Sequence, residues 1–235
     1  MQSLPPLPII PGFTIMLHAA LDTSIGNSFA VANGSTILFN AYLPAPARDS
    51  DRELAPWLIA QLAEHNMQLA DIRRWTVGVG PGSFSGLRFG IAFLKGVVAV
   101  TGADLRGVPS SQALADAAAE HAGSANRIGV LHDARCNQVI LTVYERKAAP
   151  TLKLVAEPAI LLPEQLLLPE YICDAWTTVQ PELLSALPKP IAEAMFVQPF
   201  PDASRFLQAL DGDTACEPIY VRPPVFVSPQ PIRKP

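Results

Sequence analysis

The chain has few of the residues that build disulfide-linked or metal-stabilised domains. Its 235 residues include three cysteines, Cys136, Cys173 and Cys216, and no two of them form a CxxC pair. An odd number of widely spaced cysteines argues against a disulfide framework and against a structural zinc site. The four histidines also lack the HxxxH spacing of a metallopeptidase. We therefore expect reduced thiols, no bound metal and a cytoplasmic location.

Charged residues are also scarce, at 16% of the chain, whereas apolar residues make up 49%. Average soluble domains carry about 25% charged residues. The formal net charge is −4 and there is no block of Lys and Arg. Because nucleic-acid binding needs a basic face, we expect a large hydrophobic core and no strong binding of nucleic acid by the chain alone.

No apolar run has the length of a membrane span. The longest, residues 91–100, is interrupted by Lys95 and is shorter than the roughly 20 residues that cross a bilayer. Residues 1–13 are apolar, but they lack a basic start and contain four prolines that would break a signal-peptide helix. We expect neither a signal peptide nor a membrane anchor.

Proline, in contrast, is abundant, with 24 residues clustered at 5–11, between 158 and 201, and from 218 to 235. Proline lacks a backbone N–H and disfavours helix in the residue before it. The sequence therefore predicts an extended tail over residues 213–235.

Strand and helix patterns alternate along the first half of the chain. A buried strand ends near Asp22, and Asn33-Gly34 between two apolar segments predicts a hairpin. A helix over residues 50–65 follows, with Ser50 and Glu53 as a capping box. Pro56 within it predicts a kink or a later helix start. Its apolar stripe is formed by Leu54, Leu58 and Leu62.

The remaining elements predict two lobes. The predicted strands are residues 73–80, 104–109, 127–134, 138–146, 152–162 and 171–173, with a turn at 135–137; the predicted helices are 85–102, 110–123 with Ser110 as N-cap, 182–187 and 201–212. We assign residues 13–108 to a first lobe, to which the last helix returns, and residues 109–200 to a smaller second lobe.

Five glycines crowd the stretch VGVGPGSFSGLRFG, residues 77–90. A Walker loop is excluded, because Leu87-Arg88 stands where Lys-Ser/Thr must follow the last glycine. A dinucleotide-binding loop is a loose match only, since the stretch follows the fourth strand rather than the first. The other interpretation is a tight strand-to-helix corner with Ser83 or Ser85 capping the helix.

The helix after this corner is apolar around much of its circumference. Leu87, Ile91, Leu94 and Val98 form one face, and Phe89, Phe93 and Val97 form the neighbouring one. The remainder is small or basic: Arg88, Ala92, Lys95, Gly96 and Ala99. Such a helix is buried, either inside one domain or against the helix of a partner.

The stretch GPGSFSGLRFG at residues 80–90 resembles the GPGSFTGxRIG signature of the bacterial TsaB (YeaZ-like) family. Other segments resemble the family in the same order: LDTS at 21–24, RELAPWL at 52–58, RGVPSSQALA at 106–115, HDARCNQV at 132–139 and EPIYVR at 217–222. The resemblance extends from about residue 13 to 222. The chain departs from the family pattern at Ser50, Asp51, Val79 and Ser85, as a divergent member would.

The resemblance implies a two-lobed α/β fold of the actin/Hsp70/sugar-kinase (ribonuclease H-like) group, with mixed sheets and flanking helices. It implies a non-catalytic dimerisation subunit that pairs with a TsaD-like subunit and a TsaE-like ATPase. TsaD transfers threonylcarbamoyl to the adenosine next to the tRNA anticodon. The chain would then hold no cofactor by itself, ATP or ADP would bind at an interface shared with TsaD and TsaE, and tRNA would bind through the complex. Because an exposed apolar helix face seeks cover, we also expect the chain alone to form a homodimer.

The resemblance also implies site residues. The pairing surface uses the first two helices, and we expect it at Leu54, Trp57, Leu58, Gln61, Arg88, Phe89, Ala92, Lys95 and Gly96. The signature loop comprises Gly80, Pro81, Gly82, Ser83, Phe84, Ser85 and Gly86. A remnant or composite nucleotide site would include Asp22, Thr23, Asp133 and Arg135.

An alternative is a stand-alone nucleotide-binding or phosphotransfer enzyme of the sugar-kinase-like fold. That chemistry needs a DxGT-type phosphate turn after the first strand. Here the turn reads Asp22-Thr23-Ser24, with no glycine between the Asp and the Thr.

Overall fold

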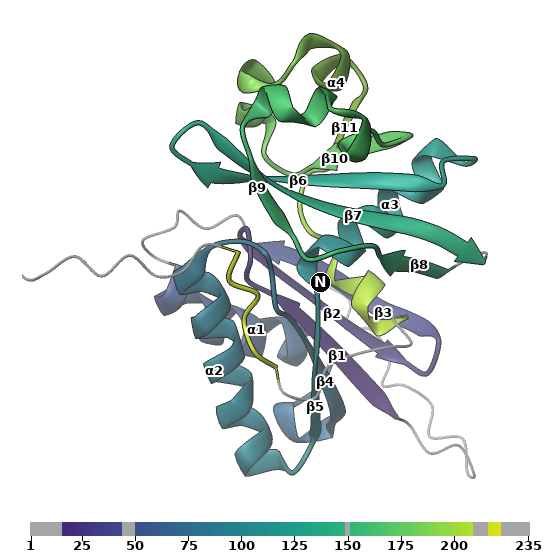
Figure 1. The fold of residues 1–235 in the computed structure, drawn as a ribbon. Coiled ribbons are helices and arrows are strands. Elements are labelled where there is room, and N and C mark those ends of the chain that lie inside the picture. Colours follow the sequence, from purple (N-terminus) through teal and green to yellow (C-terminus); the bar gives the residue numbers. More distant parts are fainter. Residues whose placement is uncertain (1–15, 44–49, 149–150, 209–215, 222–235) are drawn as a thin grey trace, which may run out of the picture.

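The computed structural model describes residues 16–43, 50–148, 151–208 and 216–221. Figure 1 shows two lobes, each built on its own β-sheet, with helices α1 and α2 on the outer side of the first lobe. The sequence prediction of an α/β fold with two mixed sheets is confirmed.

The first sheet has the strand order β3-β2-β1-β4-β5. Strands β1, β2 and β3 are joined antiparallel, whereas β4 and β5 run parallel to β1. The strands are β1 (Leu17–Asp22), β2 (Asn27–Asn33), β3 (Thr36–Leu43), β4 (Ile72–Gly78) and β5 (Asp104–Val108). The short 3₁₀ turn η1 (Leu69–Asp71) leads into β4.

Helices α1 (Ser50–Glu64) and α2 (Phe84–Thr101) cover one face of this sheet. Leu54, Leu58 and Leu62 of α1 join Ile91 and Leu94 of α2 in a core with β1, β2 and β4. The spacing of the apolar residues, four in α1 and three or four in α2, places them on one stripe and so determines which face is buried.

The second sheet has the order β11-β10-β6-β7-β8, and β9 also pairs with β7. Its strands are β6 (Arg127–Arg135), β7 (Gln138–Ala148), β8 (Thr151–Leu154), β9 (Ala159–Leu161), β10 (Ala175–Thr178) and β11 (Met195–Val197). Its outer face is covered by the 3₁₀ turns η2 (Pro163–Leu167), η3 (Pro169–Tyr171) and η4 (Pro181–Ala186) and by the short helix α4 (Lys189–Glu193).

Two segments connect the lobes. Helix α3 (Ser110–Ala122) packs on the inner face of the second sheet, and its Ala113 also contacts β1 and β2 of the first. The 3₁₀ turn η5 (Ala203–Leu207) lies on the face of the first sheet opposite α1 and α2, through Ala203 and Phe206.

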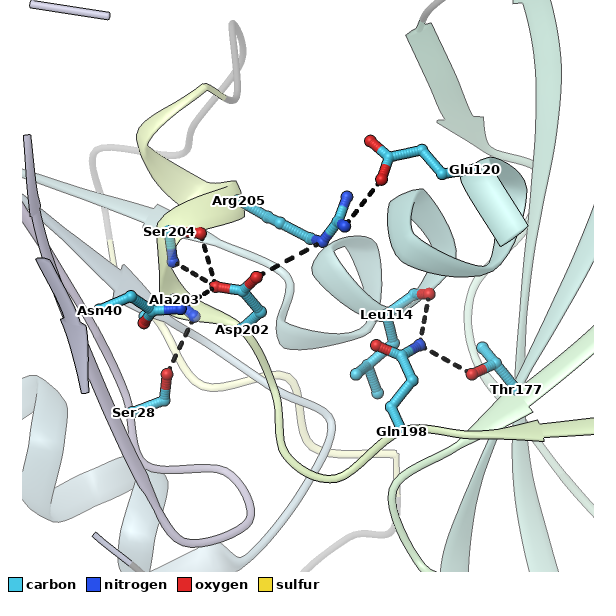
Figure 2. Close-up of polar contacts among 10 residues, drawn as sticks. All are labelled: Ser28, Asn40, Leu114, Glu120, Thr177, Gln198, Asp202, Ala203, Ser204 and Arg205. Carbon is cyan, nitrogen blue, oxygen red and sulfur yellow. Dashed lines mark hydrogen bonds and ion pairs between the residues drawn. The ribbon is translucent and has the colours of Figure 1, made fainter. Parts of the chain in front are cut away.

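Polar contacts anchor η5 to both lobes (Figure 2). Asp202 caps the turn through Ser204 N and accepts a hydrogen bond from Asn40 Nδ2 of β3 at 2.7 Å. Arg205 donates to Glu120 of α3 at 2.8 Å. The return of this segment to the first sheet is thus fixed by both apolar and charged groups.

Several local predictions need correction. The hairpin turn lies at Gly34-Ser35, one residue later than predicted, because Asn33 pairs with Thr36 and Gly34 adopts φ 59°. Helix α1 begins at Ser50 and continues through Pro56, so a later start is wrong. The capping box at Ser50 involves a side chain outside the described residues.

The second lobe differs more. The single strand predicted over residues 152–162 is two strands, β8 and β9, separated around Pro158, which cannot donate to a sheet ladder. The strand predicted at 171–173 is wrong, because Pro169 starts the 3₁₀ turn η3 and the strand begins at Ala175.

The other helix ends also need adjustment. Pro109 occupies the N-cap position of α3, not Ser110. The predicted helix at 201–212 is the 3₁₀ turn η5, and residues 209–215 lie outside the described residues, as do most of the predicted N-terminal and C-terminal segments.

Helix α2 has the length and hydropathy of a membrane-crossing helix, a feature shared with core helices of soluble proteins. Its Ile91 and Leu94 pack on the first sheet, and its Leu87 is buried as well. The same composition leaves an unusually apolar outer face.

Candidate functional site

The glycine-rich loop connects β4 to α2 and is held by hydrogen bonds from several segments. Val79 N donates to Val108 O at 2.9 Å, Ser110 N donates to Gly80 O at 2.7 Å and Ile219 N donates to Val79 O at 2.8 Å. Gly80 N donates to Ser110 Oγ at 3.1 Å. The loop is therefore tied to β5, to the start of α3 and to the segment 216–221.

The loop also packs tightly on the turn after β1. Ser83 N donates to Ser24 O at 2.8 Å, and Thr23 Oγ1 donates to Gly86 O at 2.8 Å. A Cβ atom on Gly82 would lie 2.7 Å from Ser24 O, and one on Gly86 would collide with Thr23 O. At these positions glycine is needed because the two backbones approach so closely.

The N–H groups of Gly80, Ser83, Gly86 and Leu87 are all used in hydrogen bonds within the chain. Ser83 is the N-cap of α2, with its Oγ accepting from Gly86 N at 3.3 Å. These four groups cannot bind a phosphate at the same time. The geometry favours the tight strand-to-helix corner over the phosphate loop.

Asp22 is fully buried at the end of β1, beneath this loop. Its Oδ1 accepts from Ser24 N at 2.8 Å and from the Ser24 hydroxyl. Its Oδ2 lies so close to Gly78 that a Cβ there would collide with it, and the Ser110 hydroxyl faces the same position. Burial raises the pKa of Asp22, and hydrogen bonds from Ser110 and Ser24 oppose the rise.

We expect the substitution Asp22→Asn to remove a pH dependence of stability. The folded chain with a raised Asp22 pKa holds its proton at a pH where the unfolded chain has lost it, so stability falls as pH rises above the ordinary carboxyl range. One such proton changes the free energy of unfolding by at most about 1.4 kcal/mol per pH unit. Urea unfolding between pH 4 and pH 8 measures the slope. Asp104→Asn, at a side chain 77% exposed, serves as control; equal slopes in wild type and Asp22→Asn would contradict the prediction.

A cleft of ≈ 640 Å³ opens between the loop and the second lobe. The predicted residues Thr23, Asp133 and Arg135 line it, whereas the buried Asp22 does not. Arg135 Nη1 lies 3.5 Å from Asp133 Oδ2 at the end of β6, as a local ion pair with Arg135 largely exposed. Two buried polar residues that the sequence does not mark as site residues, Asn27 and His132, also line the cleft.

The predicted partner surface divides into core and surface residues. Leu54 and Leu58 are 0% exposed and belong to the core of the first lobe, so they do not lie on a surface. Trp57, Gln61 and Phe89 are half-buried. The residues that the structure exposes are Arg88, Ala92, Lys95 and Gly96 of α2.

Further apolar residues of the same two helices are exposed. Val100 of α2 is 88% exposed and Ile59 of α1 is 52% exposed. Ala99 of α2 and Ala60 of α1 are exposed as well. Helical spacing in the sequence could have predicted the exposure of Ile59. It follows the buried Leu58 by one position and so lies on another side of α1.

Comparison with known proteins gives a consistent assignment. The family model of TsaD, tRNA N6-adenosine threonylcarbamoyltransferase, matches residues 44–198, more than half of the chain. The tRNA threonylcarbamoyladenosine biosynthesis protein TsaB of Escherichia coli (strain K12) is 30% identical over 128 residues, 54% of each chain. The alignment thus spans about half the length of that curated relative.

Two solved structures share the fold. YeaZ from Pseudomonas aeruginosa has a TM-score of 0.70 at 23% identity. An uncharacterized protein with similarity to peptidase YeaZ, also from Pseudomonas aeruginosa, has a TM-score of 0.69 at 24% identity. Each match covers 88% of this chain and 100% of the solved chain. The chain therefore belongs to the family described as TsaD, tRNA N6-adenosine threonylcarbamoyltransferase, and is a TsaB/YeaZ-like member of it.

Proposed function

We propose that the chain acts in the biosynthesis of tRNA threonylcarbamoyladenosine as a non-catalytic partner of a TsaD-like subunit. The observation that carries the proposal is the outer face of α2, which combines exposed small residues with a large apolar side chain, Ala92, Gly96 and Val100. A Cβ on Gly96 would meet no atom within 4 Å. A helix with such a flat surface allows close approach of a second helix.

The same face carries charges that can select the partner. Arg88 lies at one end of α2 and Lys95 lies near its middle, where it forms a long contact of 3.9 Å with Glu217. Exposed cations at the rim of an apolar surface contribute more to specificity than to affinity. We infer that the partner presents acidic groups around an apolar helix.

The geometry of the glycine loop supports a non-catalytic role. In an enzyme of the sugar-kinase-like fold, the turn after β1 must be open to phosphate. Here Thr23 and Ser24 border the cleft but are only 4% and 1% exposed, and Gly82 and Gly86 of the loop pack directly against them. The turn thereby supports α2, and catalysis is left to the TsaD-like subunit.

We expect the substitution Ala92→Glu to weaken the complex with the TsaD-like protein of the same organism. A carboxylate placed in the centre of an apolar helix interface is buried without a partner. The dissociation constant should rise at least about tenfold, equivalent to 1.4 kcal/mol. Co-purification followed by size-exclusion light scattering measures whether a 1:1 complex forms.

Ala186→Glu is the matched control, because Ala186 is exposed on the second lobe and the substitution is identical. It should leave the complex intact. If wild type forms no complex although it is folded, the partner role is wrong, and ATP binding by the isolated chain becomes the next measurement.

We further propose that ATP or ADP, where it acts with this chain, binds at the interface shared with the TsaD-like and TsaE-like subunits, and that tRNA binds through the complex. The net charge of −4 supports this division, since strong independent binding of tRNA needs a basic face. In the absence of a partner, the apolar surface of α2 would be covered by a second copy of the chain.

A further inference from the structure

The outer layer of the second lobe exposes large apolar side chains on one short segment, residues 162–172. Leu162, Leu167, Leu168 and Ile172 are 46%, 53%, 42% and 59% exposed. We refer to these four side chains as the η2–η3 patch. Single exposed apolar residues are normal on a protein surface, whereas a concentration of them marks an interaction site.

Three successive turns keep this segment compact. Gln165 N donates to Leu162 O, Leu168 N donates to Gln165 O and Tyr171 N donates to Leu168 O, each at 3.0 Å. In addition, Leu162 N donates to the Gln165 side chain at 2.7 Å. The four apolar residues are therefore held near one another by the backbone.

The inward side of the segment is already occupied by other apolar residues. Side chains three positions apart lie on the same side of a 3₁₀ turn. Pro163 and Leu166 of η2 are both buried, and Leu166 belongs to the core of the second lobe. Leu167 and Leu168 do not share that spacing, so they point away from the sheet and are available for a partner.

The surroundings of the patch are acidic. Residues 154–188 contain no lysine or arginine. Glu164 and Glu170 are exposed within the patch segment, and no ion pair joins either of them to a cation in the described part of the chain. Arg127 donates to the backbone oxygen of Glu170 at 2.9 Å, but its charge is paired with Glu145 at 2.8 Å.

These features restrict what can cover the patch. A second copy docked through the same patch would bring like charges together, and an anionic membrane would repel the carboxylates. The N–H groups of Gln165, Leu168 and Tyr171 are used within the segment, so an extended peptide cannot pair with them as a strand. A surface made of apolar side chains with an acidic rim instead matches an amphipathic helix that carries cations.

We propose that the η2–η3 patch docks an amphipathic, basic helix of a partner protein. The apolar face of that helix would cover the four apolar side chains, and its lysine or arginine residues would lie beside Glu164 and Glu170. In Figure 1 the layer that includes α4 lies on the side of the second sheet away from the first lobe. The surface is therefore separate from α2, and the chain would hold two partners at once.

Fluorescence anisotropy with the full chain and a labelled synthetic peptide tests the proposal. The peptide has about 18 residues, roughly five helical turns, with leucine on one face and lysine on the other. It should bind at a 1:1 ratio with a dissociation constant below about 100 μM. Peptides with glutamate in place of every lysine, or serine in place of every leucine, should bind at least about tenfold more weakly.

Two substitutions with matched controls locate the binding site. Ile172→Ser should weaken binding at least about fivefold by removing apolar contact. Its control is Ile59→Ser, since Ile59 of α1 is 52% exposed and Ile172 is 59% exposed. Glu164→Lys should weaken binding at least about fivefold by reversing a charge, whereas the same change at the exposed Glu64 of α1 should leave binding unchanged. Circular dichroism verifies that each variant is folded.

The proposal is overturned if the leucine–lysine peptide does not bind, if the acidic peptide binds equally well, or if Ile172→Ser and Glu164→Lys bind like wild type. Binding of the chain to neutral phosphatidylcholine vesicles that is lost in Ile172→Ser would also overturn it, since the patch would then contact lipid. Weaker peptide binding by Ala92→Glu would place the peptide on α2 and have the same consequence. A complex with the TsaD-like protein can form or fail independently of these results.

Discussion

Replacing Gly86 with alanine should lower the free energy of unfolding by about 3 kcal/mol, a cost expected for overpacking against an immovable neighbour. The added Cβ would collide with the backbone oxygen of Thr23, and Thr23 Oγ1 is hydrogen-bonded to Gly86 O at 2.8 Å. Neither segment can move away, because Ser83 N is bonded to Ser24 O as well. Urea unfolding monitored by circular dichroism measures the loss.

Gly96→Ala is the matched control in the same helix. A Cβ at Gly96 meets no atom within 4 Å, so the substitution should stabilise α2 by roughly 0.5–1 kcal/mol through helix propensity alone. If Gly86→Ala were as stable as wild type, the close contact between the loop and the turn after β1 would be wrong.

Acidification from pH 7 to pH 4 should destabilise the chain by about 3 kcal/mol through His132 alone. Burial lowers the pKa of His132 from 6.5 to about 4. Between these values the unfolded chain binds a proton at this residue and the folded chain does not. The stabilising effect of keeping His132 neutral is complete above pH 6.5 and is lost as pH falls toward 4.

The measurement is the difference in unfolding free energy between wild type and His132→Gln at several pH values. Asp116 titrates in the opposite sense, since burial raises its pKa to about 6, but it is present in both proteins and cancels in the difference. His121→Gln should show the pH dependence of wild type. A difference that stays constant from pH 7 to pH 4 would refute a buried neutral His132.

Local patterns predicted most elements of the first lobe, because strand, hairpin and helix signals there are short-range. The second lobe was less predictable. Prolines at 158, 163, 169 and 181 break it into short strands and 3₁₀ turns whose order is set by packing around Trp176 and Leu131 rather than by periodicity. A contact between distant segments also explains why Pro109, and not the predicted Ser110, is the N-cap of α3. The Ser110 hydroxyl accepts a hydrogen bond from Gly80 N in the glycine loop.

The candidate site was predictable in place but not in detail. The four-residue spacing of Leu54 and Leu58 identified one apolar stripe of α1. The spacing could not decide whether that stripe faces the core or a partner subunit, and the structure places it in the core. No local sequence pattern marks Asn27 and His132. They line one cleft because the fold brings together two lobes that are distant in sequence. The glycine spacing in residues 77–90, in contrast, predicted the tight corner that joins β4 to α2.

The path of the chain has a consequence for its synthesis on the ribosome. Residues 110–148 and 151–197 form the second sheet and its helices, whereas the first sheet is completed by Ala203 and Phe206 on one face and by Cys216 and Ile219 on the other. Ile219 also bonds to Val79 at the base of the glycine loop. The N-terminal strands, although translated first, therefore obtain their last packing partners after the second lobe has emerged, and the face offered by α2 is supported by its full core only once residue 219 is in place.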